Sequence, residues 1–290
     1  MQLHQPKKKF SFKLSPLPII LIASLLIIGF VFLTKSQEKQ IPVDFFSGAK
    51  NKLPTAKKVT IDAQVQQIFT DQIPKMDGDW SIYIKDLKNN QIYSYQEDKL
   101  LGSASVYKLA TIWAVYQAIE DGKISKDQVI GGTNVAEALR LMITISDNDT
   151  ALALSENLGW QNMDKLMEKE GIVDIDFLSQ NNPFISSKAT ADILERIYRK
   201  TAVSTKSSEE MLNFLLAQKI NDRIPKYLPK NTKVAHKTGE IDSIRNDAGI
   251  VYGTKSDYIF VFLSQTPNVN VASENIAQLS EKIFDELEER

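Results

Sequence analysis

The chain has 290 residues, 43% of them hydrophobic, and is therefore long enough to bury one large core or two small ones. Its formal net charge of -1 gives no electrostatic reason to expect nucleic acid as a partner. The absence of cysteine excludes disulfides, thiolate nucleophiles and thiolate-bound metal sites.

The first predicted element is a membrane anchor. Residues 1–13 contain four lysines and precede an uncharged run, residues 14–34, whose length is close to the roughly 20 residues that span a bilayer. Because basic flanks stay in the cytoplasm, we expect a cytoplasmic tail, a single-pass anchor in the cell membrane and an extracytoplasmic remainder. A cleaved signal peptide is the alternative, but the run ends in Val31, Phe32 and Leu33 rather than in a small-residue cleavage site.

A linker and a single domain are predicted after the anchor. Residues 35–60 combine prolines and a glycine with lysines and polar residues, which is typical of an extracellular linker. Residues 61–290 are expected to form the domain. Residues 80–96 alternate apolar and polar side chains, which predicts a β-hairpin. Apolar residues at helical spacing then predict a helix from Ser105 to Gly122.

Helices dominate the middle of the predicted domain, and strands its end. Apolar periodicity and closing glycines predict helices at 134–146, 149–159, 161–171, 189–200 and 208–217. Three strands follow, at 233–239, 246–253 and 257–265, and a helix at 272–289 closes the chain. Two early and three late strands predict an α/β fold of the α+β type: a five-stranded antiparallel sheet flanked by helices, with a helical insertion.

Candidate nucleophile chemistry centres on Ser105 and Lys108, which lie one helical turn apart in an apolar helix. Burial there would lower the pKa of the lysine and allow a neutral amine to take the serine's proton. The alternative is a helix-capping serine with a lysine that reaches solvent. His236 is the only histidine after the anchor, and its place directly before Lys237 in a predicted strand favours a structural role over that of a base.

Two more motifs give Ser105 and Lys108 a context. Ser146-Asp147-Asn148 ends a predicted helix, and Lys237-Thr238-Gly239 ends a predicted strand. The set S-x-x-K, S-D-N and K-T-G, in this order, is the signature of class A β-lactamases and penicillin-binding proteins. From about Trp80 to its end the chain therefore resembles this family of serine hydrolases. The resemblance implies a β-lactamase-like fold and a covalent acyl-serine mechanism that needs no metal and no organic cofactor.

The resemblance also implies a role for each catalytic candidate. Ser105 would be the nucleophile and Lys108 its base or proton relay, an assignment that is disputed for the family. Ser146 would pass a proton to the leaving nitrogen, and Lys237 would add positive charge beside Ser146. The backbone N–H groups of Ser105 and Glu240 would form the oxyanion hole.

Substrate-binding roles are implied in the same way. Asn148 would hold the side-chain amide of the substrate and Lys108, while Thr238 would bind the substrate carboxylate. Gly239 would leave room for an extended substrate along the strand. Arg245 resembles the arginine with which such β-lactamases attract the substrate carboxylate. A salt bridge from Arg245 to Asp242 or Asp247 is the alternative.

One element of the family pattern has no counterpart. The glutamate that activates the deacylating water, within E-x-x-L-N, is absent from the stretch after Gly171. Asp174 and Asp176 are the nearest carboxylates, Glu168 and Glu170 lie in the preceding predicted helix, and these four are the candidates to position that water. Solvated or capping carboxylates are the alternative. Acylation is therefore expected, whereas the sequence leaves the rate of deacylation open.

Three functions fit this pattern. The first is a membrane-anchored β-lactamase that opens the lactam amide of its substrate. The second is a D-Ala-D-Ala peptidase or transferase acting on peptidoglycan peptides. The third is a non-catalytic penicillin-binding sensor. All three predict a covalent adduct on Ser105, a β-lactam or a peptidoglycan peptide as partner, and attachment to the membrane through the N-terminal helix.

Overall fold

The computed structural model describes residues 63–178 and 182–289. The predicted cytoplasmic tail, anchor and most of the linker lie outside the described residues. Within the described ranges, every helix is too short or too polar to cross a bilayer.

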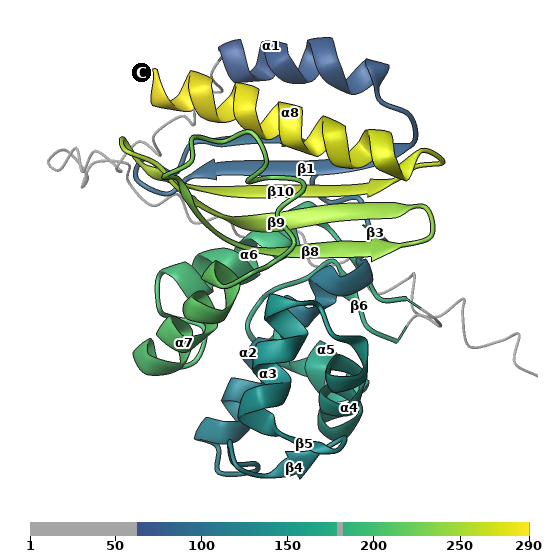
Figure 1. The fold of residues 1–290 in the computed structure, drawn as a ribbon, viewed down its shortest axis with the longest axis vertical. Helices are drawn as coiled ribbons and strands as arrows, with labels where there is room; N and C mark the ends of the chain where they lie inside the picture. The colour runs from purple at the N-terminus through teal and green to yellow at the C-terminus, as the bar shows by residue number, and fades with distance from the viewer. Residues whose placement is uncertain (1–62, 179–181, 290) are drawn as a thin grey trace, which may run out of the picture. The chain divides into compact units, whose positions relative to one another are not determined.

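A five-stranded antiparallel sheet forms the centre of the domain, in the order β2-β1-β10-β9-β8 (Figure 1). The early hairpin supplies β1 (Asp79–Asp86) and β2 (Ile92–Tyr95), and the end of the chain supplies β8 (Lys233–Ile241), β9 (Ile244–Tyr252) and β10 (Asp257–Gln265). Pairing of Ile82 with Phe262 lies within the β1–β10 ladder that joins the two ends of the chain. The predicted sheet is confirmed, and it leaves the K-T-G motif on the edge strand β8.

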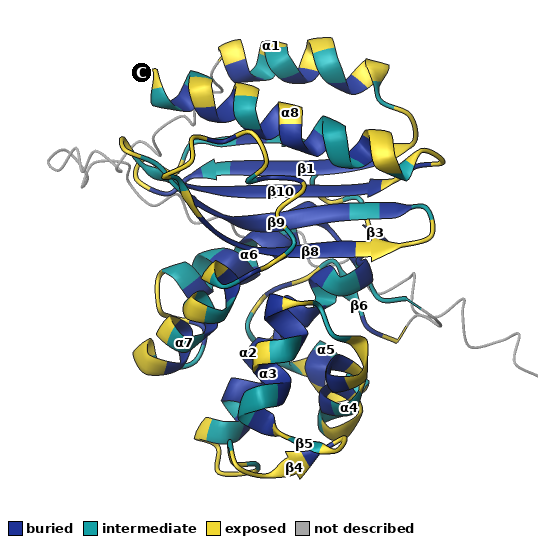
Figure 2. Cartoon of the chain, in the orientation of Figure 1, coloured by how far each residue is buried: buried dark blue, intermediate teal, exposed yellow. Residues whose placement is uncertain are grey.

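The central strands are buried on both faces, because each face supports a separate core. On β10, Tyr258, Phe260 and Phe262 belong to one core, and the alternate residues Ile259, Val261 and Leu263 belong to the other. This period of two follows from the pleat, which points successive side chains to opposite faces. Figure 2 shows the strands of the sheet largely in the colour of buried residues.

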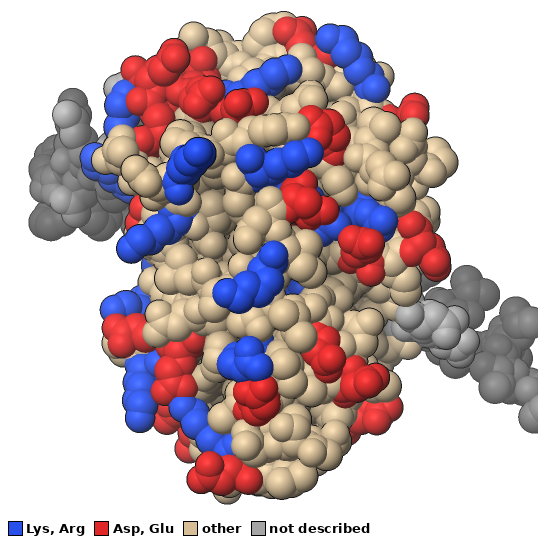
Figure 3. Space-filling model, in the orientation of Figure 1, with Lys and Arg blue, Asp and Glu red and all other residues tan. Residues whose placement is uncertain are grey.

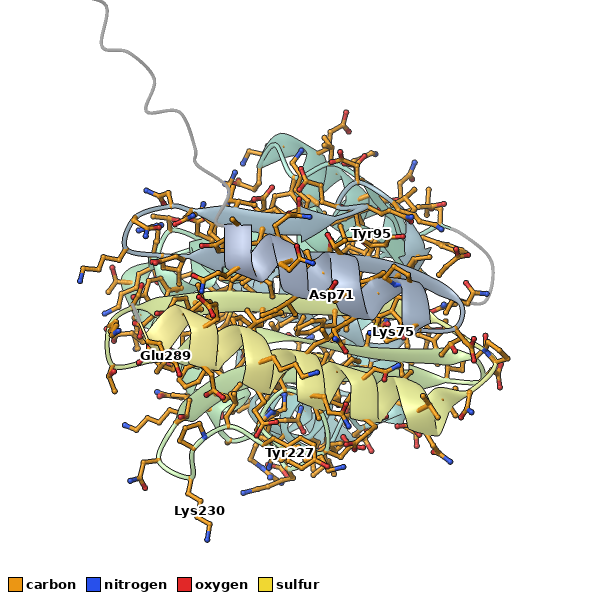
Figure 4. All side chains as sticks on the ribbon, turned by 90° about the horizontal axis from the view of Figure 1, so that it is seen from above. Asp71, Lys75, Tyr95, Tyr227, Lys230 and Glu289 are labelled. Carbon is orange, nitrogen blue, oxygen red and sulfur yellow. The ribbon has the colours of Figure 1, made fainter. Side chains whose placement is uncertain are left out.

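Two helices from the two ends of the domain cover one face of the sheet. They are α1 (Ala63–Gln72) and α8 (Val269–Glu288), which lie side by side across it (Figure 4). The loop before β8 joins this layer, because Tyr227 donates a hydrogen bond to Glu274 of α8. The closing helix was predicted from the sequence, whereas α1 was not. Only Val65 and Phe69 of α1 are fully buried, so its apolar pattern is short.

The other face carries the helices of the insertion (Figure 1). These are α2 (Lys108–Glu120), α3 (Val135–Thr144), α4 (Asn148–Leu158), α5 (Trp160–Lys169), α6 (Ser187–Tyr198) and α7 (Thr205–Leu216). Helix α2 is almost completely buried, in keeping with a sequence that is apolar on most sides of the helix. Asn134, Asp147, Ser186 and Ser204 cap α3, α4, α6 and α7 by accepting a hydrogen bond from a backbone N–H in the first turn.

Short strands that the sequence did not predict lie beside the helical layer. β3 (Leu101–Gly102) pairs with β7 (Phe184–Ile185), which pairs with β6 (Ile175–Asp176). A two-residue hairpin, β4 (Val129–Ile130) with β5 (Thr133–Asn134), precedes α3. The first group has a functional consequence, because it holds β6 and β7 next to β3, which leads into Ser105.

Acidic and basic side chains are interspersed over much of the face drawn in Figure 3. This mixture matches a formal net charge close to zero over the whole chain.

Candidate active site

Ser105 lies in a short 3-10 turn, η2 (Ala104–Tyr107), that comes directly before α2. The predicted continuous helix from Ser105 is therefore wrong in its first turn, and the α-helix begins at Lys108. Ala104 has a positive φ of 42°, which is unusual for a residue with a Cβ. The left-handed residue turns the chain sharply before Ser105 and leaves that side chain partly exposed.

Two asparagines hold this turn in place. Asn246 of β9 is fully buried and donates from Nδ2 to the backbone oxygens of Gly102, at 2.9 Å, and Ser103, at 3.0 Å. The side-chain oxygen of Asn182 accepts a hydrogen bond from the N–H of Ala104 at 3.1 Å. Sequence reasoning missed both residues, because Asn246 stands between Arg245 and Asp247 at the polar start of its strand, where an asparagine gives no signal of burial.

Lys108 is fully buried, so the alternative in which it reaches solvent is wrong. Its Nζ donates to the backbone oxygens of Ser146, at 2.8 Å, and Asp147, at 3.1 Å, and to Oδ1 of Asn148 at 2.8 Å. Within the described part of the chain, Ser105 Oγ is not among its hydrogen-bond partners. Burial lowers the pKa of Lys108 to about 8, with Asp147 opposing the shift. At pH 7 about a tenth of the amine is then neutral.

Ser146 joins the two lysines of the site. Its Oγ lies 2.8 Å from Nζ of Lys237 and 3.4 Å from Nζ of Lys108. Its backbone has a φ of 61°, in the left-handed region that costs energy for a non-glycine residue. The bonds from Lys108 to this backbone, together with the capping of α4 by Asp147, hold the strained conformation.

Lys237 is the second buried lysine, and it points from β8 toward the helical layer. It donates to Ser146 Oγ at 2.8 Å and to the backbone oxygen of Thr238 at 2.7 Å. Burial lowers the pKa of Lys237 well below its usual range, the positive charges of Lys108 and Arg223 lower it further, and Asp247 opposes the shift. The positive charge of either lysine therefore disfavours the protonated form of the other.

Gly239 allows β8 to pack closely against the turn that carries Ser105. A Cβ at this position would lie 2.8 Å from the backbone oxygen of Ser103 and 3.1 Å from Cγ2 of Val106. The resemblance implied room for substrate here. The nearest atoms instead belong to the turn, so the glycine is required by contact between two parts of the site.

A cavity of about 480 Å³ opens in front of the turn. Ser105, Asn148 and Glu240 line it, whereas Lys108, Ser146 and Lys237 do not. Lys108 is connected to the wall by its hydrogen bond to Asn148. Thr238, Gly239 and Arg245 are not among its lining residues. The rest of its wall is largely apolar and includes Tyr107, Leu152, Trp160, Phe177, Leu178 and Ile241.

Three aromatic rings form one side of this cavity and were not predicted. The ring centroids of Tyr107 and Trp160 are 5.5 Å apart, and those of Trp160 and Phe177 are 6.5 Å apart. They come from η2, α5 and the segment after β6, so no sequence motif connects them. They make this side of the cavity apolar and poorly suited to hold a polarised water.

Arg245 forms the ion pair that was the alternative to substrate binding, but with another partner than predicted. Its Nη2 lies 3.1 Å from Oε1 of Glu240, the residue opposite it on β8, rather than near Asp242 or Asp247. Asp247 is instead engaged by Nδ1 of His236, at 2.9 Å, and by the N–H of Ile224, at 3.0 Å.

His236 is buried on the sheet face opposite to that of Lys237. Its Nε2 lies 3.0 Å from Oδ1 of Asn221, so both ring nitrogens have partners away from Ser105. The geometry agrees with the structural role that the sequence favoured.

None of the four carboxylates considered for the deacylating water lines the cavity. Oε2 of Glu170 pairs with Arg196 at 3.2 Å, and Oδ1 of Asp176 accepts the N–H of Leu178 at 2.9 Å. Among the described lining residues, the only carboxylate is that of Glu240. In the same part of the chain, no three histidine or carboxylate side chains gather as a metal site.

Comparison with known proteins relates this geometry to one family. The model of the Beta-lactamase enzyme family matches residues 60–287. Beta-lactamase BRO-1 of Moraxella catarrhalis is 26% identical over 172 residues, which are 52% of this chain. The match spans about half of that relative, 55% of its length.

Solved structures are similar at lower identity. A β-lactamase from Chitinophaga pinensis superposes with a TM-score of 0.72 at 21% identity, over 77% of this chain and 99% of the other. A variant of PBP-A, solved as an acyl-enzyme complex with penicillin G, superposes with a TM-score of 0.71 at 21% identity, over 78% and 97% of the two chains. These likenesses establish the fold.

Proposed function

Because the chain belongs to the Beta-lactamase enzyme family of serine hydrolases, we propose that it opens β-lactam amides through an acyl-serine intermediate on Ser105. One observation carries the proposal. The hydroxyl of Ser146 lies within hydrogen-bonding distance of two buried amines, and one of these, Lys108, donates to Asn148, which lines a cavity together with Ser105. Two amines of lowered pKa around one hydroxyl form a path for protons.

In the first step, Ser105 Oγ attacks the lactam carbonyl carbon and its proton passes to the neutral form of Lys108. The N–H groups of Ser105 and Glu240 stabilise the oxyanion. One such donor contributes roughly 3 kcal/mol of transition-state stabilisation in serine hydrolases. Lys108 then returns a proton to Ser146 as Ser146 protonates the lactam nitrogen, and the C–N bond breaks. The proton of Ser105 thus ends on the leaving nitrogen, and both lysines regain their starting charge.

Substrate contacts complete the proposal. Asn148 lines the cavity and offers its amide nitrogen to the substrate, while its oxygen holds Lys108. Thr238 and Arg245 are proposed to bind the substrate carboxylate, and both require a local change to reach it. Gly239 keeps the edge of β8 against the turn that carries Ser105.

A penicillin-binding peptidase or sensor is the second candidate, and the same cavity favours it. Hydrolysis of an acyl-serine needs a group that activates water, and both oxygens of Glu240 are paired with arginines. We therefore propose that deacylation is slow. PBP-A, which shares the fold, was solved as an acyl-enzyme with penicillin G, and this supports a β-lactam as acyl donor.

Attachment to the membrane is proposed from the sequence alone. The uncharged run at 14–34 and the lysines before it support a single-pass anchor with the domain outside the cytoplasm. Protease treatment of intact cells and of inverted membrane vesicles tests this orientation. The domain should be degraded in the first sample and protected in the second, and the reverse pattern would refute the orientation.

The activity is tested by incubating the detergent-solubilised full chain with a chromogenic β-lactam. Ring opening is followed by absorbance, and the adduct by intact mass. Stoichiometric ring opening with an adduct that persists for hours supports slow deacylation, and rapid turnover supports a β-lactamase. Release of D-alanine from a peptide ending in D-Ala-D-Ala would favour the peptidase. No adduct and no ring opening would refute the proposed function.

A further inference from the structure

Glu240 holds two arginines at the edge of the cavity. Its Oε2 lies 2.7 Å from Nη2 of Arg223, and its Oε1 lies 3.1 Å from Nη2 of Arg245. A carboxylate bridged by two guanidinium groups is a strong anion contact. The bridge is also the arrangement that two arginines would give to the carboxylate of a bound molecule.

Arg223 has hydrogen-bond donors that the described part of the protein does not use. The residue is fully buried, and its Nη1 has no hydrogen-bond partner in the described part of the chain. Its Nε has only longer contacts, to Ser273 Oγ at 3.4 Å and Asp222 Oδ1 at 3.8 Å. Burying an unpaired guanidinium nitrogen is costly, and a second anion would relieve that cost.

Glu240 stands between these arginines and the cavity. It lines the cavity together with Ser105, and neither arginine does. Its side chain is 54% exposed, whereas those of Arg223 and Arg245 are 1% and 12% exposed. The carboxylate is therefore the member of the three that can rotate away into solvent, while packing fixes the arginines.

We propose that Glu240 is a built-in competitor that limits the acceptance of carboxylated substrates by occupying the Arg223–Arg245 pair. A carboxylated acyl donor must displace the Glu240 side chain to reach the arginines, and otherwise meets its negative charge beside Ser105. A neutral donor needs no such displacement. This inference rests on the proposed function for its kinetic test, and it concerns the selectivity of the same site.

Acylation by benzylpenicillin and by its methyl ester tests the competition, because the two differ only in the carboxylate. The rate of adduct formation on the full chain is measured by intact mass for wild type, Glu240→Gln and Glu240→Ala. We expect the acid-to-ester rate ratio to rise about tenfold in Glu240→Gln and further in Glu240→Ala, as expected when a like charge is removed. Glu274→Gln, which removes the same charge from a surface ion pair on α8, should keep the wild-type ratio.

A ratio that is unchanged or lower in both Glu240 variants overturns the competitor role. It would mean that Glu240 serves to close the β8–β9 hairpin or to orient the arginines. Absence of any adduct with either compound in wild type would instead refute the proposed acylation and leave the competition to a second measurement.

That measurement uses acetate as the probe and does not depend on Ser105. Loss of the Glu240 carboxylate leaves the buried Arg223 short of a partner, so Glu240→Ala should unfold at a lower temperature than wild type. Sodium acetate should raise the melting temperature of Glu240→Ala more than that of wild type, and more than sodium chloride of equal ionic strength does. Equal responses to acetate and chloride would show that the arginine pair does not take up a carboxylate.

Discussion

The two sides of the cavity in front of Ser105 differ in chemistry. Behind the nucleophile lie two buried amines and a hydroxyl that bond to one another and to the backbone. Across the cavity lie Trp160, Phe177 and Leu178, which offer no proton acceptor from their side chains. Attack by the serine needs proton transfer, and hydrolysis of the ester needs an activated water. Among the described residues, proton-transfer groups therefore gather around Ser105 while this part of the opposite wall offers none, which supports the proposal that acylation is faster than deacylation.

Removing the nucleophile should have the largest effect. Ser105→Ala should abolish the covalent adduct, because Tyr107 carries the other hydroxyl among the described lining residues, and burial raises its pKa to about 12 and keeps it protonated. Intact mass after incubation with a β-lactam measures the outcome. Ser204→Ala, which removes a hydroxyl at the cap of α7, should form the adduct at the wild-type rate. An adduct on Ser105→Ala would show that the nucleophile lies elsewhere.

Removing the shared hydroxyl should have the next largest effect. Ser146→Ala interrupts the proton path between the lysines and the leaving nitrogen, and we expect acylation to slow on the order of 100- to 1,000-fold. Stopped-flow measurement of ring opening under single-turnover conditions gives the rate. Thermal unfolding of the variant should confirm that it is folded. A loss below tenfold would argue that protons reach the leaving nitrogen through another group.

Acidification should slow acylation in proportion to the loss of neutral amine. Because burial lowers the pKa of Lys108 to about 8, each unit of pH below 7 should lower the acylation rate about tenfold. The rate should rise as the pH approaches 8 and then level off. A profile that is flat between pH 6 and pH 8 would exclude the amine as the base.

The smallest effect is expected from removing the carboxylates that follow α5. Asp174→Asn and Asp176→Asn should leave the lifetime of the acyl adduct unchanged, because neither residue lines the cavity. The lifetime is read from the decay of the adduct mass after excess β-lactam is removed. If either variant prolonged the adduct at an unaltered acylation rate, that carboxylate would be positioning the water, and the contrast between the two sides would fail.

Sequence patterns predicted the parts of the site that lie on regular elements. Apolar periodicity predicted the helix that buries Lys108, and strand patterns predicted the strand that carries Lys237. The position of that strand at the edge of the sheet came from the structure. The 3-10 turn at Ser105 was not predictable, because the hydrogen bonds that hold the segment before it come from Asn182 and Asn246. These contacts join residues 78 and more positions apart, which no local periodicity records.

The engaged state of Glu240 was missed for a related reason. The pairing of Glu240 with Arg245 could be predicted from the register of the two strands. Arg223 comes from a loop without regular structure, so its pairing with Glu240 could not be predicted in this way. A cross-strand pair follows from the sequence once the hairpin is known. The contact with Arg223, which lies outside the sheet, does not follow from the hairpin.

The hydrogen bonds from Asn246 to the turn before Ser105 make the nucleophile depend on chain that is synthesised much later. Asn246 is itself held by the N–H of Ser264 on the last strand. A growing polypeptide that lacks this strand already contains Ser105, but it lacks the hydrogen bonds that hold the turn before it. Reactivity toward an acyl donor should therefore appear only when synthesis of the domain is nearly complete, so that an unfinished chain is not acylated.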